Sequence, residues 1–224
     1  MKSKMVAFCL LCMALSACHP KAKQVSDDYE IEKSTNASTD PVQQSASVYD
    51  IHKSALDGDL KDVQAALKAG RKVDELDPDG RTPLMYASYN GHVAVMKALV
   101  SAGAQLDIQD KYGRTSLMLA SSGDFPDAVH LLLEKGAKPN LIDVDQHFTA
   151  LMVAAAEGQV AVIHELLNYN ADPNMVDVDD DTALNFAKQK NQTEAIKVLT
   201  PITKKRKPPR KYILYCIKKI ISVR

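Results

Sequence analysis

The chain has 224 residues, of which 46% are hydrophobic, 25% charged and only 5% aromatic. This is the composition of a soluble globular protein, and we expect its core to consist of small aliphatic side chains. The formal net charge is zero, but residues 48–200 contain 14 Lys and Arg against 23 Asp and Glu, whereas residues 201–224 contain nine Lys and Arg and no acid. An acidic body beside a short basic end argues against a reader of nucleic-acid grooves. It favours electrostatic contacts with a partner, or between tail and body.

Residues 1–17 are predicted to be a secretory signal, because two lysines precede an apolar run shorter than the roughly 20 residues of a membrane-spanning helix. The sequence Leu15-Ser16-Ala17-Cys18 resembles the lipobox of bacterial lipoproteins, in which the cysteine receives lipid and becomes the first mature residue. The resemblance implies a firm membrane anchor on Cys18. His19 stands where Asp tends to retain lipoproteins in the inner membrane, which favours the outer membrane and a domain facing the periplasm. The alternative is a simple cleaved signal with a coincidental cysteine.

Four cysteines are present, and they do not form a disulfide framework in this interpretation. Cys9 and Cys12 leave with the signal and Cys18 carries lipid, so only Cys216 remains. Residues 18–46 are polar, with almost no aliphatic side chains, and are predicted to be a disordered tether. A flexible chain of this length reaches roughly 25–30 Å.

A pattern recurs through the middle of the chain at spacings of 33, 34 and 33 residues. Each copy has a Thr, an Ala five residues later and a Leu seventeen residues later. A Thr hydroxyl caps a helix N-terminus, and a following proline suits the first turn, so each Thr is predicted to begin a helix. Gly103, Gly136 and Asn170 stand where a second helix must end. A single helix pair cannot bury its apolar face, so the units are expected to stack. The three columns are Thr82, Thr115, Thr149 and Thr182; Ala87, Ala120, Ala154 and Ala187; and Leu99, Leu132, Leu166 and Leu199.

This pattern resembles the ankyrin family, from near Tyr49 to Thr200. The segments Asp77-Pro78-Asp79-Gly80-Arg81-Thr82-Pro83-Leu84 and Gly136-Ala137-Lys138-Pro139-Asn140 carry the resemblance. It implies an all-α ankyrin-repeat solenoid of about five helix-turn-helix units with protruding loops, within residues 47–200. The first unit lacks the Thr-Pro-Leu triplet, as expected of an N-terminal cap, and the last ends on polar residues that suit a closing face.

The chain departs from the family in two places. The fourth motif position is usually a His that ties adjacent loops together, and the residues here predict a weaker loop network. One extra residue between Asp143 and Thr149 predicts that the loop 144–148 bulges from the row, as a recognition feature or as a tolerated insertion. The residues at the fourth motif position are Met85, Met118, Met152 and Asn185.

The sequence offers little chemistry for catalysis or metal binding. The histidines lack ligand spacing on one helix, and the aspartates at 177–181 lack the Gly and distal Glu of an EF-hand loop. The mature chain contains no nucleophile elbow, phosphate-binding loop or dinucleotide fingerprint. We therefore expect no catalytic residues, no metal, no cofactor and no enzyme activity.

The family binds partners through its loop tips and the adjacent face of each first helix. Aromatic and Arg side chains dominate protein interfaces, so we expect them to anchor a protein partner while the aspartates steer a basic one. For Phe148, the alternative is that it covers neighbouring loops. Carried onto this sequence, the binding residues are Asp79, Arg81, Tyr89, Asn90, Lys111, Tyr112, Arg114, Asp145, Gln146, Phe148, Glu157, Asp179 and Asp181.

The tail at 201–224 leaves three alternatives open, namely contact with anionic lipid, folding back onto the acidic repeats, or disorder. For the whole chain, the sequence predicts a lipid-anchored protein of the bacterial envelope that binds an unidentified protein partner and no nucleic acid. The alternative function is an inhibitor or immunity protein that blocks a toxin or enzyme.

Overall fold

The computed structural model describes residues 50–204, and within this range the chain forms ten α-helices and no strand. The predicted signal at 1–17, the lipid site Cys18, the tether at 18–46 and the tail from residue 205 lie outside the described residues. No helix in the described range is long and apolar enough to cross a membrane. The helices are α3 (Ile51–Asp57), α4 (Leu60–Lys68), α5 (Pro83–Tyr89), α6 (Val93–Ser101), α7 (Ser116–Ala120), α8 (Pro126–Glu134), α9 (Ala150–Glu157), α10 (Val160–Asn168), α11 (Ala183–Gln189) and α12 (Thr193–Leu199).

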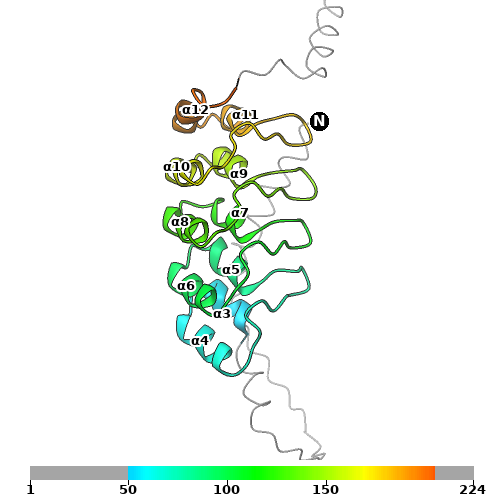
Figure 1. Ribbon diagram of the computed structural model, residues 1–224, viewed down its shortest axis with the longest axis vertical. Helices are drawn as coiled ribbons and strands as arrows, with labels where there is room; N and C mark the ends of the chain where they lie inside the picture. Colours follow the sequence, from blue (N-terminus) through cyan, green and yellow to red (C-terminus); the bar gives the residue numbers. More distant parts are fainter. Residues whose placement is uncertain (1–49, 205–224) are drawn as a thin grey trace, which may run out of the picture. The chain divides into compact units, whose positions relative to one another are not determined.

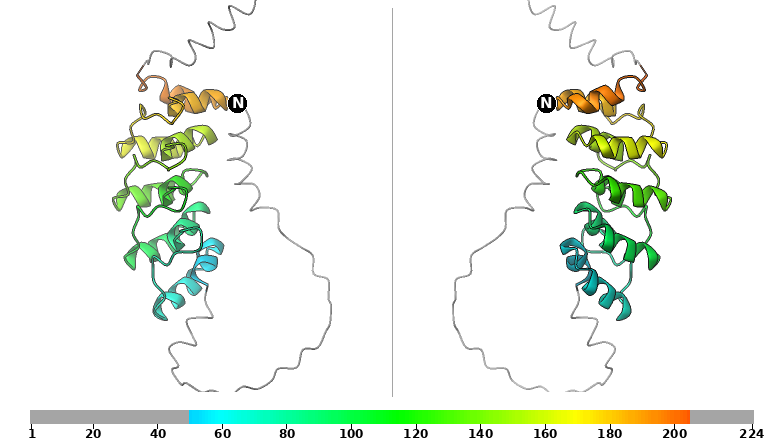
Figure 2. Two further views of the ribbon diagram at one scale, coloured as in Figure 1. Left: turned by 90° about the vertical axis from the view of Figure 1, so that its right-hand side faces the viewer. Right: turned by 90° about the vertical axis from the view of Figure 1, so that its left-hand side faces the viewer.

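The helices form five antiparallel pairs stacked in two columns (Figure 1). The first helices, α3, α5, α7, α9 and α11, pack on one another in order. The second helices, α4, α6, α8, α10 and α12, form the outer column. Seen from the sides, each pair is one layer of the stack (Figure 2). Consecutive pairs are connected by loops that protrude on one side, which we call loop one (70–81), loop two (103–114), loop three (136–148) and loop four (170–181). This arrangement confirms the predicted all-α solenoid.

The first helices begin where the sequence predicts, at a threonine. The Oγ1 atoms of Thr82 and Thr149 each accept a hydrogen bond from the backbone N–H three residues later, at 3.2 Å. Thr115 does the same for the third unit, at 3.3 Å. The first unit, which has no such threonine, uses Asp50 Oδ1 as its cap for α3. Four of the second helices, α4, α6, α8 and α10, end just before a residue with left-handed backbone, among them Asn170 with φ 63°, as expected of helix C-termini.

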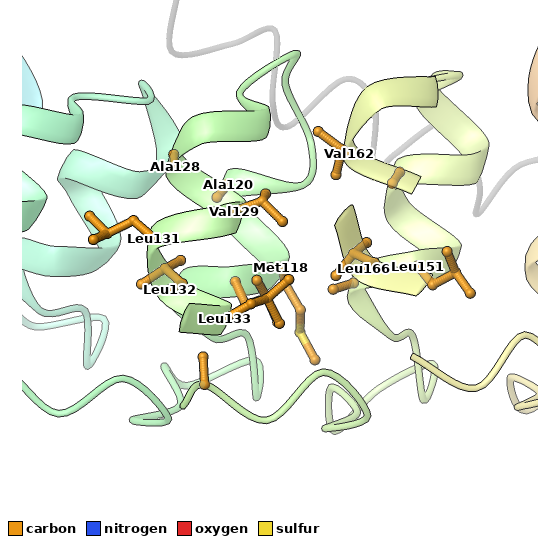
Figure 3. Close-up of a cluster of buried hydrophobic side chains, with 14 of the residues drawn as sticks. Met118, Ala120, Ala128, Val129, Leu131, Leu132, Leu133, Leu151, Val162 and Leu166 are labelled. Carbon is orange, nitrogen blue, oxygen red and sulfur yellow. The ribbon is translucent and has the colours of Figure 1, made fainter. Parts of the chain in front are cut away.

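The core consists of the predicted columns of small and aliphatic side chains. All four column alanines and all four column leucines are fully buried, and they lie between successive layers. Figure 3 shows this packing between the third and fourth units, with Ala120, Leu132 and Leu166 in one cluster. Close approach of the layers therefore follows from the alanine column, and the leucines fill the space that remains.

The short turn inside the second unit requires glycine. Gly91 has φ 66°, and a Cβ there would lie 2.3 Å from the ring of Phe125 in the third unit. Phe125 directly precedes α8 and packs against the core. The ring of one unit thus rests on the turn of the unit before it, which only a residue without a side chain permits.

One hydrogen bond recurs at every junction between units, and we call it the junction bond. Asp107 Oδ1 accepts from Lys138 N at 3.0 Å, and Asn140 Oδ1 accepts from Asp172 N at 2.8 Å. The first junction has the same contact, from Gln105 N to Asp74 Oδ1 at 3.1 Å. The last has it from Lys204 N to Asn174 Oδ1 at 2.8 Å, although no further helix pair follows in the described range. Each loop base is therefore tied to the chain one unit further on.

Candidate protein-binding surface

Each protruding loop ends in a tight tip that is organised by one aspartate. In loop two, Asp110 Oδ1 accepts hydrogen bonds from Tyr112 N and Arg114 N, both at 2.9 Å. Asp110 N in turn donates to Arg114 O at 3.0 Å, which closes the tip. A carboxylate that accepts hydrogen bonds from two backbone N–H groups takes the place of the water molecules to which these groups would otherwise donate. The equivalent aspartates are Asp77, Asp143 and Asp177.

Backbone hydrogen bonds join the four tips into a continuous row. Lys111 N donates to Asp79 O at 3.0 Å, which links loop two to loop one, and Val144 N donates to Tyr112 O at 3.0 Å. Val178 N donates to Gln146 O at 3.1 Å and links loop four to loop three. Neighbouring tips are thus held at fixed spacing. The residue that follows each tip aspartate is exposed, and these four residues, which we call the tip row, are Pro78, Lys111, Val144 and Val178.

The predicted insertion is in loop three and leaves the row intact. Asp143 N bonds to Phe148 O, five residues on, whereas the other tips close over four residues. The acceptor for loop four moves with it, from the second residue after the tip aspartate to the third, which is Gln146. Residues 144–147 are all exposed. The extra residue therefore enlarges this tip without breaking its bond to the next.

The expected weakness of the loop network concerns the fourth motif position. Met85, Met118 and Met152 are buried apolar side chains there, and Asn185 is exposed on the last unit. Connections between loops come instead from the tip bonds and the junction bonds, neither of which needs that position.

The two predicted arginine anchors are used within the protein. Arg114 donates from Nε and from a terminal nitrogen to Asp110 Oδ2, at 2.8 and 2.6 Å. Arg81 Nε lies 3.8 Å from the same carboxylate oxygen, and the Asp110 side chain is fully buried. Arg114 also lies over the Tyr112 ring, 4.8 Å from its centroid. Two arginines from adjacent loops thus converge on one buried carboxylate, an arrangement that fixes loop position.

Phe148 and Asp181 stand at the same position as these arginines, directly before the capping threonine. The Phe148 ring is half-buried and meets Phe186 edge to face, with centroids 5.1 Å apart. Asp181 is largely buried and accepts a hydrogen bond from Gln189 Nε2 at 2.9 Å. Both side chains therefore make contacts inside the repeats.

The remaining predicted residues fall into two groups. Tyr89, Asn90 and Glu157 lie at the C-terminal ends of first helices, and Asn90 Nδ2 donates to Leu56 O at 2.7 Å, which ties the second unit to the first. The residues at the tips are Asp79, Lys111, Tyr112, Asp145, Gln146 and Asp179, of which Lys111 and Asp79 form an ion pair. The predicted set is thus not a single cluster.

The charge differs between the two ends of the row. No Lys or Arg occurs between Lys138 and Lys188, a stretch that includes most of loop three and all of loop four. Burial raises the pKa of Asp177, backbone N–H groups offset part of the effect, and the charges of neighbouring aspartates add to it. Burial likewise raises the pKa of Asp143. In loop one, burial opposes ionisation of Asp77, but the Tyr86 hydroxyl, backbone N–H groups and nearby Arg81 outweigh it and lower the pKa.

Sequence reasoning missed two features of this surface. Val178 was not among the expected binding residues, yet it is 50% exposed at the tip next to Val144, which is 61% exposed and lies in the loop predicted to bulge, so two aliphatic side chains stand at adjacent acidic tips. The acceptors of the junction bonds were also missed, although their regular Asp or Asn spacing was readable in the sequence. No group of three or more His, Cys, Asp or Glu within residues 50–204 has the arrangement of a metal site.

The architecture defines a class, that of helical-repeat solenoids whose protruding loop tips form a continuous row. Comparison with known families then identifies the family. The profile described as ankyrin repeats in three copies matches residues 51–143 and 141–208. The chain belongs to the ankyrin-repeat family. No curated protein matches the chain. Members of this family are typically interaction modules without enzyme activity, and the repeats indicate a role in protein–protein interaction.

Proposed function

We propose that the chain binds its protein partner through the tips of loops two, three and four. The observation that carries this proposal is the exposure of Val144 and Val178 at adjacent tips whose spacing is fixed by the bond from Val178 N to Gln146 O. Exposed aliphatic side chains beside polar ones mark interaction sites on soluble domains. Tyr112 lies next in the row and bonds through its carbonyl to Val144 N. Tyrosine at such a position supplies large contact area with few rotatable bonds.

The charge of this surface indicates the chemistry of the partner. Asp145, Asp179 and Asp180 are exposed at the same tips as the valines, within a stretch of sequence that contains no Lys or Arg. A partner segment that alternates basic and aliphatic side chains matches both features. The acids would accelerate its approach and the valines would contribute contact area.

Affinity capture from detergent-solubilised envelope tests the surface, using wild type and the double variant Val144→Ser with Val178→Ser. Leu76→Ser is the matched control, because Leu76 is an equally exposed aliphatic residue, 55% accessible, in loop one. We expect the double variant to lose capture of the co-eluting partner and the control to retain it. Equal loss in both variants, or in neither, contradicts the proposed surface.

We further propose that Cys18 carries lipid and anchors the protein in the bacterial envelope, in the outer membrane facing the periplasm. The support is the lipobox-like sequence Leu15-Ser16-Ala17-Cys18 after an apolar signal segment. Labelling of cells with an alkyne fatty acid tests this. We expect label on wild type and on Cys216→Ser, but none on Cys18→Ser. Separation of the two membranes then reports the location, and recovery of labelled protein in the inner membrane contradicts the outer-membrane assignment.

A second candidate function is inhibition of a toxin or enzyme, as an immunity protein would achieve. The absence of any Lys or Arg between Lys138 and Lys188 favours it, because an anionic surface suits a basic target. The distinguishing measurement is the activity of the captured partner with and without an excess of the protein. Loss of activity supports inhibition, and unchanged activity supports a purely adaptor role.

A further inference from the structure

The turn inside the third unit is built differently from the turns of the other four units. In the first, second and fourth units a glycine with left-handed backbone follows the first helix, and in the fifth unit Asn191 takes its place with φ 58°. The equivalent residue of the third unit is Asp124, and within the described turn 121–125 neither Gly123 nor Asp124 has left-handed backbone. α7 ends at Ala120 after five residues, whereas the other first helices have seven or eight. The left-handed helix cap is thus missing from this unit.

One hydrogen bond that closes the turn of the other units does not form in the third. In those units the N–H directly after the left-handed residue donates to the carbonyl five residues earlier, as from His92 N to Ala87 O at 2.9 Å. The first, fourth and fifth units make the same bond at 2.8 to 2.9 Å. In the third unit, all of whose residues are described, Phe125 N makes no such bond to Ala120 O. The carbonyl end of α7 therefore lacks the closure that holds the other first helices.

Two serine hydroxyls bond to the end of α7 instead. Ser121 Oγ donates to Leu117 O, and Ser122 Oγ donates to Leu119 O, both at 2.7 Å. Such bonds satisfy carbonyls locally, but they compete with the backbone hydrogen bonds of the helix. They connect α7 only to its own last residues, so they do not replace the missing closure.

The third unit also cannot make a side-chain bond that ties other units to the unit before them. His92 Nε2 donates to Leu56 O at 2.9 Å, and the equivalent bond of the fifth unit, from a glutamine, measures 3.2 Å. Phe125 stands at the same repeat position, and its side chain has no polar atom. Its ring packs on Gly91 of the second unit instead. The contact between the second and third units is therefore apolar where the contact between the first and second units is also hydrogen-bonded.

We infer that α7 and its turn, residues 116–125, form the weakest layer of the stack and open before either end of it. In a stack of repeats each unit is stabilised by its own bonds and by its neighbours, so end units with a single neighbour ordinarily open first. Here the first and fifth units keep the closing bond of the turn, whereas the third lacks both this bond and the side-chain tie. The inference does not depend on the partner-binding role of the tip row.

Hydrogen exchange of the full chain in detergent tests this order of opening, with mass spectrometry that resolves single amides. The informative amides are those of Leu119 and Ser121, which donate to carbonyls of the same unit at 3.1 and 3.0 Å. We expect them to exchange about tenfold faster than the equivalent amides of α5 and α9, and faster than those of α3 and α11. Equal rates in all five first helices, the fastest exchange in α3 or α11, or fast exchange at Phe125 N alone overturns the inference.

Replacement of the turn tests its cause. Gly123→Asn, Asp124→Gly and Phe125→His together give the third unit the Asn-Gly-His turn of the second, and we expect exchange in α7 to slow to about the rate in α5. Asp124→Ala is the matched control, because it changes the same exposed residue without favouring left-handed backbone, and we expect it to leave exchange in α7 unchanged. Fast exchange in the folded triple variant, or equal slowing by the control, overturns the turn as the cause. The wild-type measurement decides the order of opening by itself, whether or not the triple variant folds.

A consequence for recognition rests on the proposed function. α7 begins directly after loop two, whose tip contains Tyr112, so opening of this layer loosens one side of the proposed surface. A partner that spans the tips of loops two and three should therefore slow exchange in α7, which is measured with and without the captured partner. Slower exchange supports the consequence, and unchanged exchange with the partner bound overturns it. Fast exchange in α7 of a protein whose capture does not depend on Val144 and Val178 would contradict the proposed function and leave the weakest layer standing.

Discussion

Loops one and two differ from loops three and four at the position before the capping threonine. In the first two loops this residue is arginine, and both arginines reach the buried Asp110 carboxylate. In loop three it is Phe148, which packs on Phe186, and in loop four it is Asp181, which accepts from Gln189. All four loops share the tip aspartate and the bonds between neighbouring tips, although loop three closes over one more residue than the others. The comparison shows that a loop of this kind can be stabilised by an ion-pair network or by local packing. Only the ion-pair network uses positively charged side chains for contacts within the protein.

The consequence is a division of roles along the row. Loops one and two hold cations against carboxylates, as in the pair of Lys111 with Asp79. Loops three and four hold aspartates whose pKa values are raised, at Asp143 and Asp177. The first half of the row thus pairs its charges between loops, whereas no Lys or Arg occurs in the sequence of loop four.

The largest expected effect is at the ion-pair network. Arg114→Ala leaves the fully buried Asp110 carboxylate with only the more distant Arg81, and we expect a loss of about 3 kcal/mol in the free energy of unfolding. Lys111→Ala removes an exposed ion pair instead and is expected to cost much less. Urea denaturation followed by circular dichroism measures both, since the chain has no tryptophan. Equal losses would mean that the buried network does not stabilise the first loops.

The next effect concerns Phe148 in loop three. Phe148→Ala removes the edge-to-face contact with Phe186, and we expect a loss of about 2 kcal/mol, below the range for fully buried phenylalanines because the ring is half-exposed. Phe148→Leu should retain most of the stability. If Phe148→Ala left the unfolding midpoint unchanged but abolished partner capture, Phe148 would be a binding anchor after all.

Opposite signs are expected for two equivalent tip aspartates. Asp77→Asn keeps the acceptor oxygen but loses the charge that Tyr86 and Arg81 stabilise, so we expect a loss of about 1–2 kcal/mol at pH 7. Asp177→Asn removes a carboxylate that is destabilised by burial and by its neighbours, so stability should stay equal or rise by up to about 1 kcal/mol.

The pH dependence of these two variants separates them further. The pKa of Asp77 is lowered on folding, so its contribution is present above about pH 4 and is lost as the pH falls through the folded value. The pKa of Asp177 is raised, so the wild type gains stability as the pH falls through the folded value towards about 4. Denaturation curves at several pH values between 7 and 3 should therefore show both differences from wild type shrinking. Differences that stay constant with pH would exclude the charge as their cause.

The smallest expected effect is at His147, which has left-handed backbone with φ 60°. The equivalent residues of loops one and two are Gly80 and Gly113, which adopt this conformation at less cost. We expect His147→Gly to raise the free energy of unfolding by about 0.5 kcal/mol. Gly80→Ala, which adds a side chain at the equivalent position of loop one, should lower it by about 1 kcal/mol. A thermal shift of the same sign in both variants would contradict this account.

The fold could be predicted from the sequence because residues at equivalent positions of each repeat have equivalent surroundings. The columns at Ala87 and Leu99 and their equivalents predicted the buried layers, and the threonines predicted the helix starts. It reached the candidate surface less well. Residue type alone suggested Arg114 as a binding anchor, but whether an arginine faces a partner depends on a carboxylate such as Asp110 being buried within its reach. That information lies in three-dimensional packing and not in the motif.

The junction bond has a consequence for how this protein can evolve. Every junction uses a side-chain oxygen of Asp or Asn and a backbone N–H, so any unit presents to its neighbour the same acceptor and the same donor. Duplication or deletion of one unit of about 33 residues would create a new junction without an orphaned donor. Recognition can therefore change through the number of tips in the row as well as through substitutions at each tip.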